Sequence, residues 1–304
     1  MAMDTADSLP IVSILDDEDH FSKCFGVFRK RINERDMTND DWLDVIFTDI
    51  GPKVCHSVGQ STKVTLKALG VGSGDGRTED YFLSHFKDHF AQIHQCLIEP
   101  NKLLAEQHKK NIQQTNWKEV IYDWREQTLE EYMEGVKELE KGVKYHFISA
   151  IHSLYHMTNP EESLEFLYDQ LEENGILLFA LASEKSTSGR IGPGIPSQYS
   201  KQVINSSRFA LDYFDTRGIP YALHIRDFTL DVSGCLDKDI SEEASLLLDF
   251  LTHVKDFCKA PLPPGIKDTV FSTLREMLGN SQSQETIHPH HFIVVKRQHD
   301  QKLK

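Results

Sequence analysis

The chain has 304 residues, of which 39% are hydrophobic and 26% are charged, and its formal net charge is -14. This composition suits a folded protein built as one large domain and excludes a globally disordered chain. The negative charge argues against a surface that tracks nucleic-acid phosphates, and no apolar run approaches the roughly 18 residues that cross a bilayer. We therefore expect neither nucleic acid nor a membrane as a partner.

The cysteines and the first residues indicate a cellular compartment. The chain has five cysteines, an odd number, and no two of them form a CxxC pair. This usage favours reduced thiols in an intracellular setting. The opening segment MAMDTADSLPIVSILDDEDHF is acidic and has only a short apolar patch, which argues against a secretory signal. We therefore expect a cytoplasmic protein.

The predicted elements begin with helices and continue as alternating strands and helices. Residues 19–50 are predicted to be helical, because HFSKCFGVFRKRI has apolar side chains at helical spacing. From residue 62 to 183, helical segments alternate with the apolar strand segments KVTLKALGVG, AQIHQCLIEP, VIYDW, KYHFISAI and ILLFALASE. This alternation predicts an α/β fold, Rossmann-like, with a mostly parallel sheet and helices on both faces. The sheet is seven-stranded when the two strands predicted after residue 203 are added.

The second half of the chain carries three further expectations. The segment PEESLEFLYDQLEENG, residues 160–175, is predicted as a helix that begins at its proline and stops before its glycine. Residues 184–200 are rich in glycine, proline and serine and are predicted as a loop. Residues 203–260 are predicted as helix, strand and helix, and a last helix and strand close the chain.

Four glycines lie within seven positions of the segment LKALGVGSGDGRTEDYFL, residues 66–83. In doubly wound folds the ligand lies at the turn after the first strand, where glycine permits positive φ and a close approach of backbone. The spacing of Gly70, Gly72 and Gly74 is neither the G-x-G-x-x-G of a dinucleotide fingerprint nor a Walker loop. We expect these three glycines to contact a cofactor.

An acidic residue, Glu99, ends the second strand segment in CLIEP. A carboxylate at this place accepts hydrogen bonds from the two ribose hydroxyls of a nucleoside. A glycine loop combined with such an acid is the arrangement that holds the adenosyl half of S-adenosylmethionine, which we expect as the cofactor. The segment after the third strand, with Thr128, is expected to contact the adenine.

The fourth strand runs into the loop of FISAIHSLYHMTNPEESL. Ile151 is expected near the cofactor, and this loop meets the transferred methyl group in small-molecule methyltransferases. His152, Tyr155 and His156 are therefore candidate contacts of the substrate.

On these segments the chain resembles the histamine N-methyltransferase family, over most of residues 15–296. The matching pieces are HFSKCFGVFRKRI, ALGVGSGDG, IEPN, FISAIHSLYHMTNP, LLLDFLT followed by APLPPG, and FIVV. The resemblance implies a class I methyltransferase core with a smaller lobe over the amine site. It also implies S-adenosylmethionine as donor, an imidazole nitrogen as acceptor and a monomer.

The resemblance assigns roles to single residues. Gly72, Glu99 and Ile151 match the cofactor contacts of the family. Glu34 matches a glutamate that meets the substrate amine, and aromatic pocket residues of the family are matched by Phe25 and Phe250.

Histidines replace other residue types at four of the implied pocket positions. His152 stands where the family has glutamine, His156 replaces a tyrosine, His253 replaces a glutamate, and His288 aligns with an asparagine. We expect a redesigned acceptor pocket, with His152, His156 and His288 as candidates for orienting the acceptor. If protonated, these imidazoles would suit a substrate carboxylate, as in a histidine-containing dipeptide. Neutral imidazoles would bind a metal, but no spacing such as HExxH indicates one, and we assign no metal ligand.

The sequence therefore predicts one methyltransferase domain over residues 1–304. Within it we expect a helical lid at 15–50, a cofactor-binding core at 62–183, and a substrate lobe with closing strands at 184–296. The function that we expect is N-methylation of a small imidazole-containing or biogenic amine. Two alternatives remain open, which are a carnosine N-methyltransferase and a methyltransferase-like protein that binds an amine or a metal without turnover.

Overall fold

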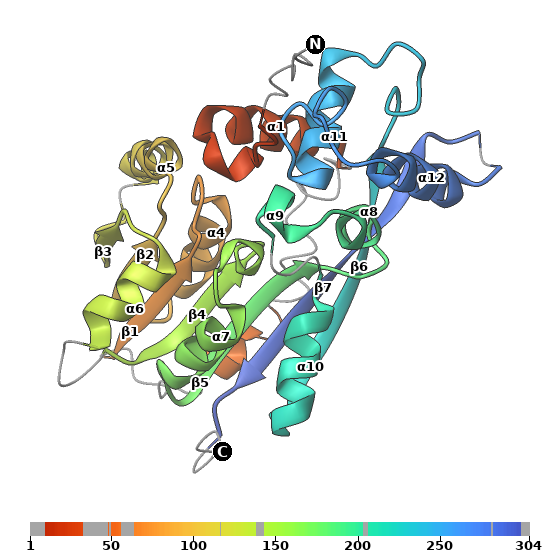
Figure 1. Ribbon diagram of the computed structural model, residues 1–304. Helices are drawn as coiled ribbons and strands as arrows, with labels where there is room; N and C mark the ends of the chain where they lie inside the picture. Colours follow the sequence, from red (N-terminus) through yellow and green to blue (C-terminus); the bar gives the residue numbers. More distant parts are fainter. Residues whose placement is uncertain are drawn as a thin grey trace. The chain divides into compact units, whose positions relative to one another are not determined.

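A computed structural model of the protein describes residues 10–32, 48, 50–55, 64–115, 117–137, 143–202, 206–280 and 282–298. Within these residues, seven strands form one sheet in the order β3-β2-β1-β4-β5-β7-β6 (Figure 1). The strands are β1 (Thr65–Val71), β2 (Gln92–Ile98), β3 (Val120–Arg125), β4 (Tyr145–Ile151), β5 (Leu171–Ala182), β6 (Tyr221–Asp231) and β7 (Glu285–Lys296).

The sheet is mostly parallel. The neighbouring pairs among β3, β2, β1, β4 and β5 all run parallel. Strand β7 runs antiparallel to β5, because the amide of Asn174 donates to the carbonyl of Arg297 while the amide of Ser183 donates to that of Pro289. The predicted α/β fold with a mostly parallel sheet is confirmed, and its strand order reverses direction between β1 and β4, where ligands bind in such folds.

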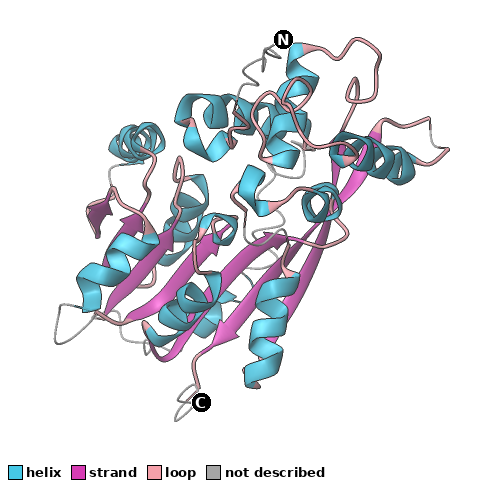
Figure 2. Ribbon diagram, viewed as in Figure 1, coloured by secondary structure: helices cyan, strands magenta, loops and turns pink. Residues whose placement is uncertain are grey.

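Figure 2 distinguishes the helices from the strands by colour. The helices are α1 (Glu18–Arg31), α4 (Arg77–Phe86), α5 (Lys102–Thr115), α6 (Leu129–Lys137), α7 (Pro160–Asp169), α8 (Thr187–Ile191), α9 (Ser197–Ser200), α10 (Arg208–Arg217), α11 (Glu242–Thr252) and α12 (Ile266–Leu278). Short 3-10 helices are η1 (Ile14–Asp16), η2 (Leu154–His156) and η3 (Gly192–Gly194). None of the described helices is long and apolar enough to span a membrane.

The chain clusters into two compact units. The helical unit consists of Met1–Asn39, Ala182–Ser206 and Arg226–His290, and the sheet unit consists of Asp40–Leu181, Ser207–Ile225 and His291–Lys304. In the helical unit α1 packs along α11, and α8 contacts both α11 and α12. In the sheet unit the apolar faces of β1, β4 and β5 form the core, where Leu69, Ile148 and Phe179 have no solvent exposure.

Three segments differ from the predictions. Helix α7 ends at Asp169, and β5 already begins at Leu171, because Leu171 pairs with Tyr145 and a β-bulge absorbs the residues before Ile176. The segment 184–200, predicted as a loop, contains α8, η3 and α9, where the Ser186 hydroxyl accepts from the amide of Gly189 and caps α8. Helix α11 ends at Thr252 instead of continuing toward residue 260.

Candidate functional site

The glycine-rich segment forms the turn between β1 and α4 in the sheet unit. Gly70 lies inside β1, while Gly72 and Gly74 follow it with φ values of 64° and 56°. The Gly72 amide donates to the carbonyl of Ile98 at 2.8 Å, which ties the turn to the end of β2. Gly72 and Gly74 therefore serve a left-handed turn at the carboxyl ends of neighbouring strands, as the sequence predicts, whereas Gly70 belongs to the strand.

Gly72 and Gly74 differ in what surrounds them. A Cβ atom on Gly72 would lie 2.5 Å from the Cβ of Ser153, so the turn packs directly against the segment that follows β4. Among the described residues other than its two chain neighbours, no atom would lie within 4 Å of a Cβ atom on Gly74. The backbone at Gly74 is therefore open to a ligand, and the backbone at Gly72 is fixed by protein.

Glu99 follows the last residue of β2 and reaches the glycine turn. Its side chain is largely buried, and its Oε2 accepts from the amide of Gly74 at 2.7 Å. Its Oε1 accepts from the amide of Asn101 at 2.8 Å. An ionised carboxylate accepts several hydrogen bonds, and these two bonds orient the side chain of Glu99 at the glycine turn.

Two buried hydroxyl groups beside this turn support a polar ligand. Ser73 lies in the turn itself, and Ser153 lies against Gly72. Among the described residues, neither hydroxyl oxygen has a hydrogen-bond partner, although both are buried. Buried hydroxyls normally have partners, so the open backbone, the oriented carboxylate and these hydroxyls together fit a nucleoside-type cofactor such as S-adenosylmethionine.

A second acid, Glu79, lies beneath the turn and was missed by the sequence analysis. A Cβ atom on Gly70 would lie 3.0 Å from the Cγ of Glu79, and Ser149 Oγ donates to Glu79 Oε1 at 3.3 Å. Burial raises the pKa of Glu79 to about 8, so this side chain is a neutral acid at pH 7. No sequence signal identifies it, because an acidic residue in the first turn of a helix is ordinary.

The carboxyl end of β4 bears the other predicted residues of the sheet unit. Ile151 is the last residue of β4, and His152 follows with a φ of 54°, which is uncommon for a residue other than glycine. The amide of His152 donates to the carbonyl of Ala180 at 2.8 Å, and its Nδ1 lies 3.4 Å from the hydroxyl of Tyr155. Such backbone strain is typical of functional positions.

His152 and His156 are neutral at physiological pH. The protein that surrounds them lowers the pKa of each imidazole to about 4, by desolvation. The side chain of His156 still reaches solvent and that of His152 is half-buried, so water moderates the shift but does not change its direction. These two side chains therefore offer neutral donors and acceptors and no positive charge for a substrate carboxylate.

Thr128 has a local structural role. Its hydroxyl accepts from the amide of Glu131 at 3.2 Å, and the carboxylate of Glu131 accepts from the amide of Thr128 at 2.8 Å. This reciprocal pair is a capping box at the start of α6. The expected contact of Thr128 with adenine stays a prediction.

In the helical unit, the structure brings together aromatic side chains from α1 and α11. The ring of Phe250 lies 4.4 Å from that of Phe28 and 5.9 Å from that of Phe25, between centroids. Phe21 lies 6.2 Å from Phe250, and His288 on β7 meets Phe28 edge-on at 5.6 Å. The predicted residues Phe25, Phe250 and His288 therefore belong to one aromatic cluster, which also includes Phe21 and Phe28.

His253 ends α11 and is buried. Its φ is 56°, its carbonyl accepts from the amide of Ile14, and its Nε2 lies 3.1 Å from the Nε2 of Gln202. These contacts give His253 a structural role as a left-handed helix end. Its ring nevertheless lies 5.7 Å from that of Phe250, at the border of the aromatic cluster. Glu34, the predicted contact of the substrate amine, lies outside the described residues.

Comparisons with known proteins identify the type of domain. A family model described as a methyltransferase domain matches residues 49–212. Histamine N-methyltransferase of Danio rerio is 26% identical over 88% of this chain and 90% of its own length. Carnosine N-methyltransferase 2 of Gallus gallus is 25% identical over 72% of this chain and 70% of its own length. A solved Bacillus halodurans protein, described as a candidate methyltransferase, is 9% identical with a TM-score of 0.50 and covers 82% of this chain and 98% of its own.

Proposed function

The chain belongs to the methyltransferase-domain family, and from this premise we propose that it methylates a ring nitrogen of a small imidazole-containing amine. S-adenosylmethionine is its cofactor, which supplies an electrophilic methyl group on a sulfonium. The observation that carries the binding of the cofactor is the open turn at Gly74 held by the buried carboxylate of Glu99. The acceptor is inferred from the aromatic cluster and from the similarity to histamine N-methyltransferase.

The residues of the sheet unit supply the binding of the cofactor. Glu99 would accept hydrogen bonds from the ribose hydroxyls, and the hydroxyls of Ser73 and Ser153, which have no partner among the described residues, would provide further polar contacts. Gly74 allows the ligand to approach the backbone, because no side chain stands there. Methyl transfer needs alignment of a neutral lone pair and exclusion of water, so no nucleophile on the protein is required.

The aromatic cluster of the helical unit supports a flat acceptor. Phe25, Phe28 and Phe250 pack together in this cluster, where we expect them to contact an imidazole, and aromatic faces also attract a cationic amine. The similarity to histamine N-methyltransferase over most of the chain points to the same class of acceptor. Transfer requires the neutral imidazole, and a hydrogen bond to the second ring nitrogen would fix its tautomer.

The charge of the loop histidines favours an amine over a dipeptide. His152 and His156 are neutral at pH 7, so they do not compensate the charge of a substrate carboxylate. A neutral imidazole can still hydrogen-bond to the second nitrogen of an acceptor ring. The acceptor that we propose is therefore histamine-like and lacks a carboxylate.

A second candidate is N-methylation of carnosine or a related histidine dipeptide. Its support is the similarity to the Gallus gallus carnosine N-methyltransferase. The same assay distinguishes the two candidates, since carnosine carries a carboxylate and histamine does not.

The experiment is methyl transfer from labelled S-adenosylmethionine to histamine, histidine, carnosine and simple aliphatic amines. We expect the highest kcat/KM with histamine or a close analogue without a carboxylate. A preference for carnosine would replace the first candidate by the second. Tight binding of S-adenosylmethionine without transfer to any acceptor would contradict both and favour a binding protein.

A further inference from the structure

A histidine, a cysteine and an aspartate that the proposed function does not use meet in the helical unit. His20 and Cys24 lie one turn apart on α1, and Asp249 comes from α11, which packs along α1. One ligand-type atom of each residue lies within 4.8 Å of the other two. Because His20 and Cys24 are four positions apart, they share one face of the helix.

We propose that His20, Cys24 and Asp249 bind a divalent transition-metal ion, with Zn²⁺ as the preferred ion. An imidazole nitrogen, a thiolate and one carboxylate oxygen are the three ligand types that Zn²⁺ takes in proteins. A thiolate among the ligands selects against Mg²⁺ and Ca²⁺, which prefer oxygen. Three protein ligands leave a fourth tetrahedral position for water.

The charges of the site balance when the ion is bound. Zn²⁺ carries two positive charges, and the thiolate and the carboxylate each carry one negative charge, while His20 binds as a neutral ring. The complex is therefore neutral, which suits its surroundings, since Cys24 and Asp249 are buried. Burial and the nearby carboxylate of Asp249 raise the pKa of Cys24 to about 12, so the metal-free residue is a thiol. Binding would release this proton to the buffer as the bond between sulfur and metal forms.

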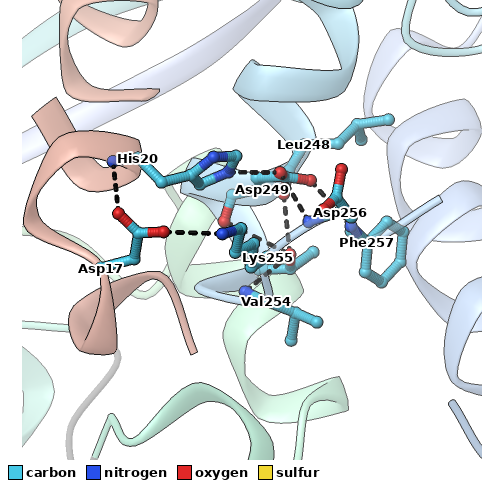
Figure 3. Close-up of polar contacts among 9 residues, drawn as sticks. Asp17, His20, Leu248, Asp249, Val254, Lys255, Asp256 and Phe257 are labelled. Atoms are coloured by element: carbon cyan, nitrogen blue, oxygen red, sulfur yellow. Dashed lines mark hydrogen bonds and ion pairs between the residues drawn. The ribbon is translucent and has the colours of Figure 1, made fainter. Parts of the chain in front are cut away.

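The carboxylate of Asp249 is already oriented by backbone donors. Its Oδ2 accepts from the amide of Asp256 and its Oδ1 from the amide of Phe257, both at 2.8 Å. Figure 3 shows these bonds together with the contact from His20. The same segment is anchored to the start of α1, because Lys255 pairs with Asp17 at 2.6 Å. Hydrogen bonds of this kind to a ligating carboxylate are typical of metal sites.

The spacing of His20 and Asp249 needs only a small change to admit the ion. His20 Nε2 and Asp249 Oδ2 are now 2.8 Å apart. Two ligands at the usual zinc distances are about 3.3 Å apart in a tetrahedral site, so the pair would open by about 0.5 Å. A simple contact between His20 and Asp249 would explain these two residues without a metal, but it does not involve Cys24. A role of Cys24 in binding therefore distinguishes a metal site from a simple contact of the two side chains.

The site would fix the aromatic cluster. Each proposed ligand is followed in the chain by a phenylalanine of this cluster, namely Phe21 after His20, Phe25 after Cys24 and Phe250 after Asp249. A bound ion would link α1 to α11 at the level of these rings. We therefore assign the metal a structural role, in addition to the methyl transfer proposed above.

The test is titration of chelator-treated full-length protein with Co²⁺ and Zn²⁺. We expect one Co²⁺ per chain with a thiolate-to-cobalt charge-transfer band in the near ultraviolet, displacement by Zn²⁺, and a Kd for Zn²⁺ below about 1 μM. The matched control is Cys235→Ser, which changes another buried free cysteine of the same unit and should leave binding unchanged. Cys24→Ser should remove the band and raise the Kd at least about tenfold.

His20→Gln provides a second variant, because His20 is more exposed than Cys24 and its replacement is less disruptive to folding. It should raise the Kd to the same extent, and circular dichroism checks that each variant is folded. Absence of one-to-one binding in the wild-type chain would overturn the proposal. Binding with the same Kd and the same band in folded Cys24→Ser or His20→Gln would also overturn it.

Discussion

The replacement of Gly72 by alanine tests how the cofactor turn is built. Gly72 has a φ of 64°, and an added Cβ would lie 2.5 Å from the Cβ of Ser153. The backbone conformation costs an alanine about 1–2 kcal/mol. The clash adds about 1–3 kcal/mol, as for other overpacked interiors. We therefore expect the free energy of unfolding to fall by about 2–5 kcal/mol, a large part of the stability of a typical domain.

The matched control is Gly74→Ala. Gly74 has a similar φ of 56°, but apart from its chain neighbours no atom of the described part of the chain lies within 4 Å of its added Cβ. Only the conformational cost applies, so we expect a loss of about 1–2 kcal/mol. The double variant Gly72→Ala with Ser153→Gly removes the clashing atom and should recover about 1–3 kcal/mol relative to the sum of the two single changes.

The assay is urea unfolding of Gly72→Ala, Gly74→Ala, Ser153→Gly and the double variant. Calorimetric titration measures the affinity of each for S-adenosylmethionine. Because the clash pushes the turn away from Ser153, the affinity of Gly72→Ala for the cofactor should fall at least about tenfold. The reasoning is refuted if Gly72→Ala is no less stable than Gly74→Ala. It is also refuted if Ser153→Gly restores none of the lost stability.

Three further predictions concern single residues. Glu99→Gln should keep the fold and raise the Kd for S-adenosylmethionine about 10–100-fold, because hydrogen bonds to a charged acceptor contribute about 1.5–3 kcal/mol. Titration calorimetry at matched ionic strength measures this Kd. Burial raises the pKa of Glu79 from 4.5 to about 8, so the folded state retains a proton that the unfolded chain loses. Relative to Glu79→Gln, the wild type should therefore lose about 1 kcal/mol of unfolding free energy per pH unit between about pH 5 and 8. Urea unfolding of both proteins at several pH values measures this, and an equal pH dependence of the two would contradict it. Phe250→Leu should raise the KM for the imidazole acceptor about threefold to tenfold and leave the Kd for the cofactor unchanged. An equal rise of the KM and of this Kd would show a general defect of folding and contradict a role of Phe250 in binding the acceptor.

The fold could be predicted from local pattern, because strand and helix periods alternate clearly between residues 62 and 183. The residues at which the helices and strands begin and end were harder to predict. The segment LEENG after Asp169 has helical composition, yet pairing of Leu171 with Tyr145 draws it into β5. The short helices of 184–200 depend on a cap at Ser186 and on packing of α8 against α11 and α12, which composition alone does not reveal.

The site was predictable where its signal is local and hidden where it depends on contacts across the chain. Gly72, Gly74 and Glu99 follow from a motif and its position after strands. Glu79 is unusual only because Gly70 and Ser149 surround it, and these contacts arise from three separate elements. Asp249 lies 229 positions from His20, so no spacing rule joins them. The neutral state of His152 and His156 likewise depends on surroundings that the sequence does not state.

The most direct test of the account is the position of methyl transfer to histamine. The product formed from labelled S-adenosylmethionine would be isolated and its methyl group located by nuclear magnetic resonance. We predict one methyl group on a ring nitrogen of the imidazole, with loss of the product in Glu99→Gln at subsaturating cofactor. Transfer to the side-chain amine, or no transfer by protein that binds the cofactor, would contradict the central claim.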